Sequence, residues 1–247
     1  MYEIIILSIS LFLIAFLYAS VGQGGASGYL AVLGLFTLSS EVLRPTALCL
    51  NIVVATIGSW QFYRKGFFNW KIFFPFAISS VPFSFVGGIL VLPNLIYNRL
   101  VGIILLYAAY RLLTISQQDI ELNETYKKEI PLSYSVFFGS CIGFISGITG
   151  AGGGVLLSPL LIFKKWANVK EAAGVSILFI LVNSIAGVLG QLVHFPVLPN
   201  FLPYLITAVL FGGLGGSYFG SIFPVSMLLN RLLGLILLIA SIKMIFV

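Results

Sequence analysis

Two clusters of glycine interrupt long apolar segments of the sequence. The first is Gly22-Gln23-Gly24-Gly25, and the second is Gly150-Ala151-Gly152-Gly153-Gly154. Glycine lets a ligand approach the backbone closely, and a helix that begins just after such a break points free N–H groups and a positive dipole end toward it. Each cluster could form half of an anion cradle, although tight helix contact is the plainer explanation for either cluster alone.

Polar side chains near the clusters could complete such a cradle. Ser27 follows the first cluster, and Asn183 and Gln191 lie in the apolar segment after the second. Hydroxyl and amide groups can donate to an anion without bringing a charge into a bilayer, whereas hydrogen bonding between helices is the commoner role of any one of them. The predicted substrate-binding residues are Gly22, Gln23, Gly24, Gly25, Ser27, Gly150, Gly152, Gly153, Gly154, Asn183 and Gln191.

Acidic residues are absent from the predicted spans. Glu3 and Glu41 stand at segment ends, four of the seven acids fall within 115–131, and no basic residue lies deep in a span. A cation path or a carboxylate proton relay normally needs an acid in the membrane. The pattern therefore favours a path for anions.

One short motif suggests an enzyme instead. Gly25-Ala26-Ser27-Gly28 matches the Gly-x-Ser-Gly of rhomboid-type intramembrane proteases, in which Ser27 would be the nucleophile. Such enzymes need a membrane-embedded histidine as base, but the only histidine, His194, follows an apolar segment and precedes Pro196. No catalytic residue is therefore expected, and the protease remains a minor alternative. The chain has no P-loop, complete G-x-G-x-x-G or His/Cys cluster, so neither a cofactor nor a metal is expected.

Composition excludes a water-soluble domain. The 247 residues are 60% hydrophobic and 8% charged, with a mean hydropathy of +1.11, whereas soluble domains carry about 25% charged residues. A chain of this kind is expected to be a multi-pass helical protein of the cell membrane, with lipid as its surroundings and no nucleic acid as a partner. Its oligomeric state is left open.

The apolar segments form two related halves. Segments 2–39 and 132–163 are too long for one span and contain the glycine clusters, and six others have single-span length. A shift of 128 carries the first cluster onto the second and Gly87-Gly88 onto Gly215-Gly216, and a shift of 132 carries Asn98-Arg99-Leu100 onto Asn230-Arg231-Leu232. We expect one membrane repeat at 1–114, a polar cytoplasmic linker at 115–131 and a second repeat at 132–247.

Positive charge favours helical hairpins in the two long segments. If each hairpin turns at its glycines and returns, ten basic residues share one face and three share the other, as the positive-inside rule requires. The second half then enters the membrane from the opposite side. The predicted fold is an all-α membrane protein of two inverted repeats, each a glycine-broken hairpin plus three transmembrane helices, with both termini outside.

These features together resemble the TauE/SafE family of membrane permeases. The resemblance rests on the two halves, on GITGAGGGVLLSPLL in the second half and on Val182-Asn183-Ser184-Ile185-Ala186-Gly187 in the helix that follows. It covers the whole chain, although Ala26 stands where the second half has Gly154. The resemblance implies a secondary transporter for a small sulfur-containing anion such as sulfite, thiosulfate or an organosulfonate. An anion channel of the same architecture is the main alternative.

Overall fold

The computed structural model describes residues 2–20, 24–36, 39–114, 130–194, 198–222 and 227–246, and these contain helices and no strand. The helices of the first half are α1 (Tyr2–Ser20), α2 (Ala26–Leu35), α3 (Ser40–Arg64), α4 (Trp70–Ile89) and α5 (Asn94–Thr114). Those of the second half are α7 (Leu132–Thr149), α8 (Gly154–Phe163), α9 (Val169–Gln191), α10 (Leu202–Ile222) and α11 (Met227–Phe246). The predicted all-α fold and the order of its segments are confirmed.

The long helices have the length and composition of membrane spans. Within the described residues, seven helices are long and apolar enough to cross a bilayer: α1, α3, α4, α5, α7, α9 and α10. Large apolar side chains such as Ile78, Ile103, Phe211 and Ile239 face outward from four of the long helices, where a soluble protein would carry polar groups. By contrast, α2 and α8 have 10 residues each, about 15 Å, which is half of the hydrocarbon core.

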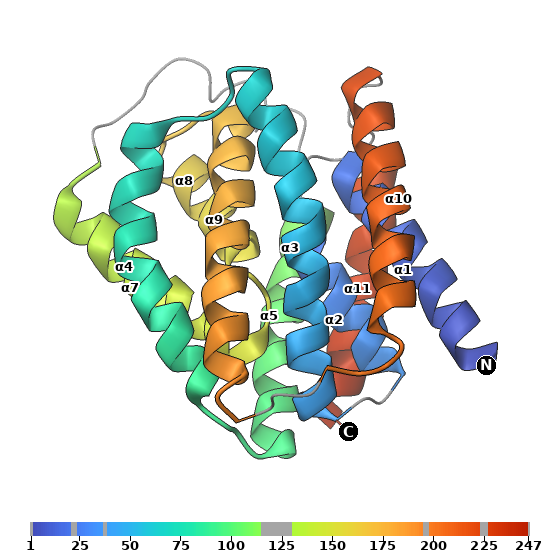
Figure 1. Cartoon of the computed structure of the whole chain (residues 1–247). Helices are drawn as coiled ribbons and strands as arrows, with labels where there is room; N and C mark the ends of the chain where they lie inside the picture. The colour runs from blue at the N-terminus through green and yellow to red at the C-terminus, as the bar shows by residue number, and fades with distance from the viewer. Residues whose placement is uncertain are drawn as a thin grey trace.

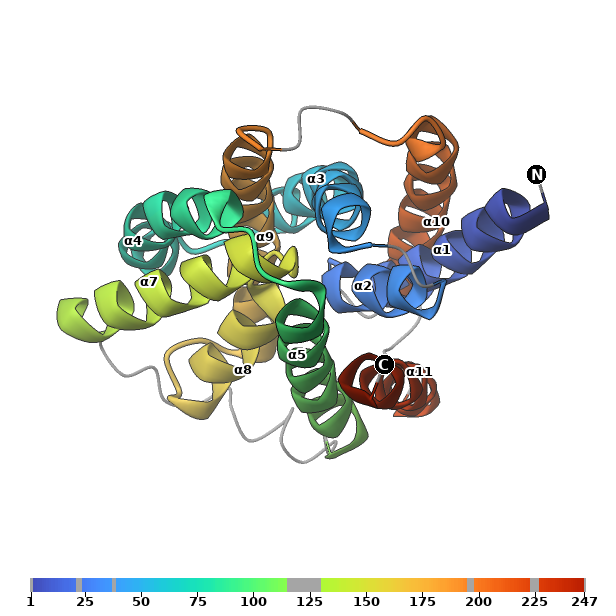
Figure 2. The ribbon, with the colours of Figure 1, turned by 90° about the horizontal axis from the view of Figure 1, so that it is seen from below.

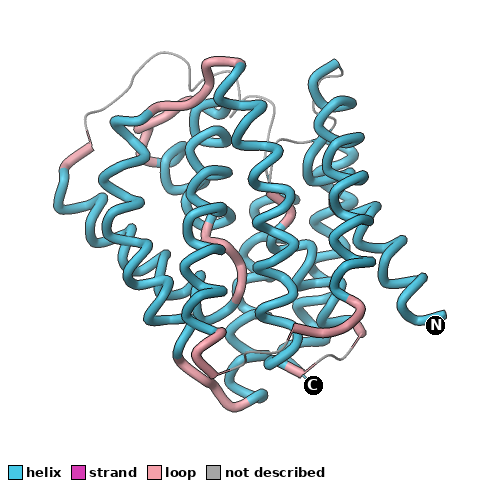
Figure 3. Tube along the Cα trace, viewed as in Figure 1, coloured by secondary structure: helices cyan, strands magenta, loops and turns pink. Residues whose placement is uncertain are grey.

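Glycines in left-handed conformation separate each short helix from the helix before it. Gly25 has φ 75° just before α2, while Gly150, Gly152 and Gly153 have φ of 82°, 68° and 78° between α7 and α8. Side chains with a Cβ rarely adopt this region, so the chain leaves one helix and starts another at these points. Figure 3 shows the loop between α7 and α8 in the middle of the bundle.

The helices pair across the two halves. Helix α1 packs on α10, α4 on α7, α5 on α11 and α3 on α9, and Figure 2 shows α4 beside α7 and α5 beside α11. Individual contacts also occur twice, with the roles of the two halves exchanged. At the α5–α11 contact, Gly102 faces Ser241 and Ile245, while Gly234 faces Ala109 and Leu113. A shift of 132 converts one set into the other.

Two opposite ends of the bundle can be defined in Figure 1. The terminal face is the end where α1 begins at Tyr2 and α11 ends at Phe246, and the linker face is the end where α3 ends at Arg64 and α9 begins at Val169. Helix α2 runs toward the terminal face, because its last residue, Leu35, contacts Lys243 near the end of α11. Helix α8 runs toward the linker face and ends at Phe163 beside Arg111 of α5.

Candidate functional site

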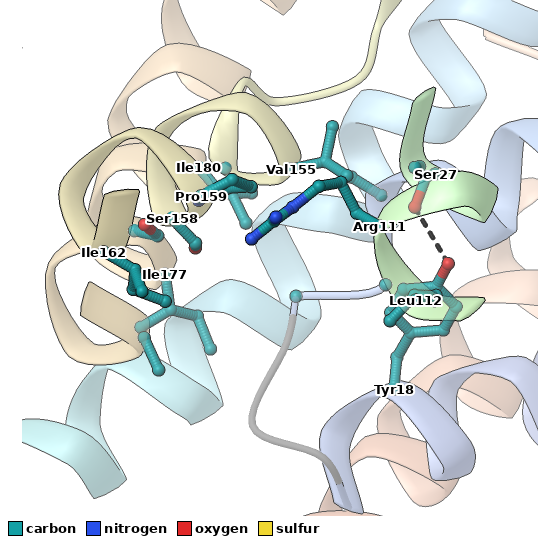
Figure 4. A pocket seen from close by; sticks show the side chains of 17 residues that line it. Tyr18, Ser27, Arg111, Leu112, Val155, Ser158, Pro159, Ile162, Ile177 and Ile180 are labelled. Atoms are coloured by element: carbon teal, nitrogen blue, oxygen red, sulfur yellow. Dashed lines mark hydrogen bonds between the residues drawn. The ribbon is translucent and has the colours of Figure 1, made fainter. Parts of the chain in front are cut away.

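A pocket of about 80 Å³ lies where the starts of the two short helices approach one another (Figure 4). Its walls come from the break before α2, from the first two turns of α8, from the last turns of α5 and from α9. The volume suffices for several water molecules or a small anion. The elements that the sequence singled out, the two glycine-broken segments, therefore meet at one cavity.

The backbone at this cavity is suited to a negative charge. Gly24, Gly25 and Ser27 at the start of α2, and Gly154 at the start of α8, all line it. The first N–H groups of a helix have no partner within that helix, and the positive end of the helix dipole lies beside them. Two such ends approach the cavity from opposite directions.

Arg111 provides a full positive charge at the same cavity. It lies in the last turn of α5, and Figure 4 shows its side chain entering the space between α8 and the start of α2. Its guanidinium carbon lies 5.9 Å from the centre of the Phe163 ring. Its Nε atom is buried and has no hydrogen-bond partner among the described residues. From the sequence alone, Arg111 counts only among the basic residues that set topology, although its place just inside the end of an apolar segment was a usable signal.

Hydroxyl groups complete the polar part of the wall. The Ser27 hydroxyl is buried and lies 2.9 Å from the hydroxyl of Tyr18. Ser176 of α9 is also buried at the pocket, and its Oγ has no hydrogen-bond partner in the described structure. Among the residues that the structure describes, no carboxylate lines the cavity.

Among the described residues, no catalytic base lies beside Ser27. It shares the pocket with Ile180 of α9, whereas His194 follows the end of α9 at Gln191. Fourteen residues separate Ile180 from His194, about 20 Å along a helix. The partner of the Ser27 hydroxyl is therefore a tyrosine and not a base.

Ile180 lies between the two glycine breaks. A Cβ added at Gly24 would come within 2.7 Å of its Cδ1, and one added at Gly152 within 2.8 Å of its Cγ2. A Cβ at Gly154 would clash with the same side chain. The breaks therefore pack on one isoleucine. At Gly152 a left-handed backbone conformation adds to this close approach.

The other predicted residues lie outside the pocket lining. Asn183 donates to the Ser80 hydroxyl at 3.0 Å and to the Phe179 carbonyl at 2.9 Å, and Gln191 donates to the Gly147 carbonyl at 3.4 Å. The Gly150 carbonyl accepts a bond of 3.2 Å from Asn51. These amides tie α9 to α4, and they tie both α3 and α9 to the end of α7. Hydrogen bonding between helices is the commoner role that was expected of such residues. Gly22 and Gln23 fall outside the described residues.

Arg44 corrects the expectation that no basic residue lies deep in the helices. It is only 2% exposed, and its guanidinium donates to the carbonyls of Leu90, Gly87, Gly88 and Gly147 at 3.0–3.5 Å. Carbonyls at helix ends have no partner within their helix, so they can solvate a buried cation. Arg44 thereby joins the end of α4 to the end of α7 on the terminal side of the bundle.

Metal ligands and reactive thiols do not gather at the site. Among the residues searched, no three His, Cys, Asp or Glu side chains come together. Cys49 and Cys141 are free, and neither lines the pocket.

Comparison with known proteins agrees with this architecture. The family described as "Sulfite exporter TauE/SafE" matches residues 7–244. The chain is 38% identical to the probable membrane transporter protein y4hK of Sinorhizobium fredii over 99% of both chains. It is 25% identical to the probable membrane transporter protein YdhB of Bacillus subtilis over 86% of this chain and 87% of that one. No solved structure matches.

The family match covers most of the chain, and the match with y4hK extends over almost the full length of both chains. The chain therefore belongs to the TauE/SafE sulfite exporter family and is a multi-pass membrane transporter.

Proposed function

We propose that this transporter carries a small sulfur-containing anion, such as sulfite, thiosulfate or an organosulfonate, and binds it in the pocket between the two glycine breaks. The observation that carries the proposal is the composition of the pocket. Two helix starts, one guanidinium and the side chains of Ser27, Ser158 and Ser176 line it, and among the described residues no carboxylate does. The family's description as a sulfite exporter supports the choice of sulfur oxyanions.

Each group has a defined part in binding. The N–H groups at the starts of α2 and α8 donate to the anion's oxygen atoms, as at other helix starts that bind oxyanions. Arg111 supplies the opposite charge, and its planar guanidinium can contact two oxygens of one anion. The hydroxyls of Ser27 and Ser176 add neutral donors. Because the breaks lie at the inner ends of half-length helices, the anion is held near the bilayer midplane.

Transport then follows from the relation between the halves. The exchanged helix contacts, such as Gly102 with Ser241 and Gly234 with Ala109, support two inverted repeats, 1–114 and 132–247, joined by the linker 115–131. In this proposal the anion reaches the pocket from the linker face, where α5 and α8 end, while Arg44 and its carbonyl partners close the terminal side. Rocking one repeat against the other exposes the anion alternately on each side.

Transport by the purified protein tests this proposal. Proteoliposomes are loaded with unlabelled sulfite or thiosulfate, and uptake of the labelled anion is compared with that of protein-free liposomes. A carrier gives saturable uptake and counterflow, in which the internal anion speeds the entry of the external one. If neither anion shows saturable uptake, the proposed substrate class is overturned. Flux without counterflow assigns the chain to the channel alternative.

A further inference from the structure

Lys243 occupies the position in the second half that Arg111 occupies in the first. The run beginning Asn98-Arg99-Leu100 repeats at Asn230-Arg231-Leu232, and the same shift of 132 carries Arg111 onto Lys243. Each residue lies in the last turn of the last helix of its half. The two cations therefore stand near opposite faces of the bundle.

Each cation contacts the end of the other half's short helix. The Arg111 guanidinium lies over the ring of Phe163, the last residue of α8. The Lys243 ammonium donates to the carbonyl of Leu35, the last residue of α2. A shift of 128 carries Leu35 onto Phe163, so the two contacts are counterparts.

The surroundings of the two cations differ in one respect. Around Arg111, Leu112 and Ile162 line the open pocket. Their counterparts, Met244 and Gly34, pack closely: a Cβ added at Gly34 would lie 2.7 Å from the Met244 sulfur. Leu30, the counterpart of the pocket residue Ser158, is fully buried, whereas Ser158 is half-buried. Among the described residues, the packing near Lys243 is therefore tighter than the packing around the pocket near Arg111.

We propose that Lys243 is a second anion-binding residue, which receives the substrate from the terminal face when the transporter is open to that face. This inference rests on the proposed function. In the present state the Lys243 ammonium donates to the Leu35 carbonyl, at the negative end of the α2 dipole, and not to the anion. In the opposite state the cations exchange roles: Lys243 lines the open cavity, and Arg111 turns to the carbonyl end of α8.

Side-specific kinetics test the assignment. Exchange of labelled thiosulfate is measured in right-side-out and inside-out membrane vesicles, and the ratio of KM at the terminal face to KM at the linker face is compared between variants. Loss of a charged donor to an anion is expected to change this ratio about tenfold. Lys243→Gln should raise the ratio, and Arg111→Gln should lower it.

Control variants separate a binding role from a structural one. Arg99→Gln removes an exposed cation at the start of α5 and should leave the ratio unchanged. Lys243→Arg keeps the positive charge and should keep the wild-type ratio of KM values. If Lys243→Gln does not fold, Lys243→Met takes its place. A ratio that stays at the wild-type value in Lys243→Gln and Lys243→Met overturns this inference while transport itself stands. Failure of the wild type to exchange either thiosulfate or sulfite overturns the proposed function, and this inference with it.

Discussion

At the scale of single residues, Arg44 and Arg111 have different surroundings. The Nε atom of each is buried without a hydrogen-bond partner among the described residues, but the terminal nitrogens of Arg44 donate to four carbonyl oxygens, whereas Arg111 is half-buried and lines a cavity. A buried cation that lacks protein acceptors is costly unless an anion or water supplies them. The first arginine is therefore structural, and the second is available to a ligand.

Replacing Arg44 should destabilise the fold. In Arg44→Met the carbonyls of Leu90, Gly87 and Gly147 lose a charged donor in a place that water does not reach, at an expected cost of about 3 kcal/mol. Thermal unfolding in detergent measures this, with the exposed Arg99→Gln as the control. An unfolding temperature equal to that of the control would show that the four bonds contribute little.

Ser27 gives a second test at the residue scale. Ser27→Ala removes one neutral donor from the pocket and leaves the Tyr18 hydroxyl in place, so sulfite flux should fall only about fivefold. The protease alternative requires complete loss of an activity that depends on the Ser27 hydroxyl. Cleavage of a transmembrane peptide by the wild type but not by Ser27→Ala would favour that alternative.

At the scale of helices, glycine serves close packing as much as ligand approach. A Cβ at Gly147 would clash with the Ser84 carbonyl, and one at Gly143 with the Ser80 carbonyl, so α4 and α7 touch along their backbones. By contrast, a Cβ at Gly213 would meet Val54 at 3.4 Å, an ordinary contact. Gly147→Ala should therefore lower the unfolding temperature in detergent clearly, and Gly213→Ala should not. Equal unfolding temperatures for the two variants would contradict the packing described for α4 and α7.

Helix order and the two breaks could be predicted from the sequence, because composition, glycine spacing and the repeat act locally. Of the predicted site residues, Gly24, Gly25, Ser27 and Gly154 line the pocket, and their role in binding stays a prediction. The helix bounds agree with the apolar segments; for example, the predicted segment 132–163 contains α7 and α8, which begin at Leu132 and end at Phe163. Side-chain partners could not be predicted in this way. Asn183 donates to Ser80, Gln191 donates to the Gly147 carbonyl, and Arg111 lines the pocket. These contacts depend on which helix packs beside each residue, and the sequence does not show that.

At the scale of the whole molecule, orientation in the membrane follows from charge. With the linker face in the cytoplasm, ten of the thirteen Lys and Arg residues belong to the cytoplasmic side, as the positive-inside rule requires. Fusion of alkaline phosphatase to the C-terminus should then be active, and fusion of green fluorescent protein should be dark. A fluorescent fusion at the C-terminus would reverse the assignment of the two faces.

The central claim, that a small sulfur oxyanion binds in the pocket beside Arg111, is tested most directly by binding to the purified protein. A ligand that binds only the folded state raises the unfolding temperature as its concentration exceeds its Kd. Sulfite should stabilise the wild type and Lys71→Gln, which removes an exposed cation at the start of α4, whereas Arg111→Gln should need about tenfold more sulfite for the same shift. An equal response of Arg111→Gln and the wild type would place the anion elsewhere and contradict the account.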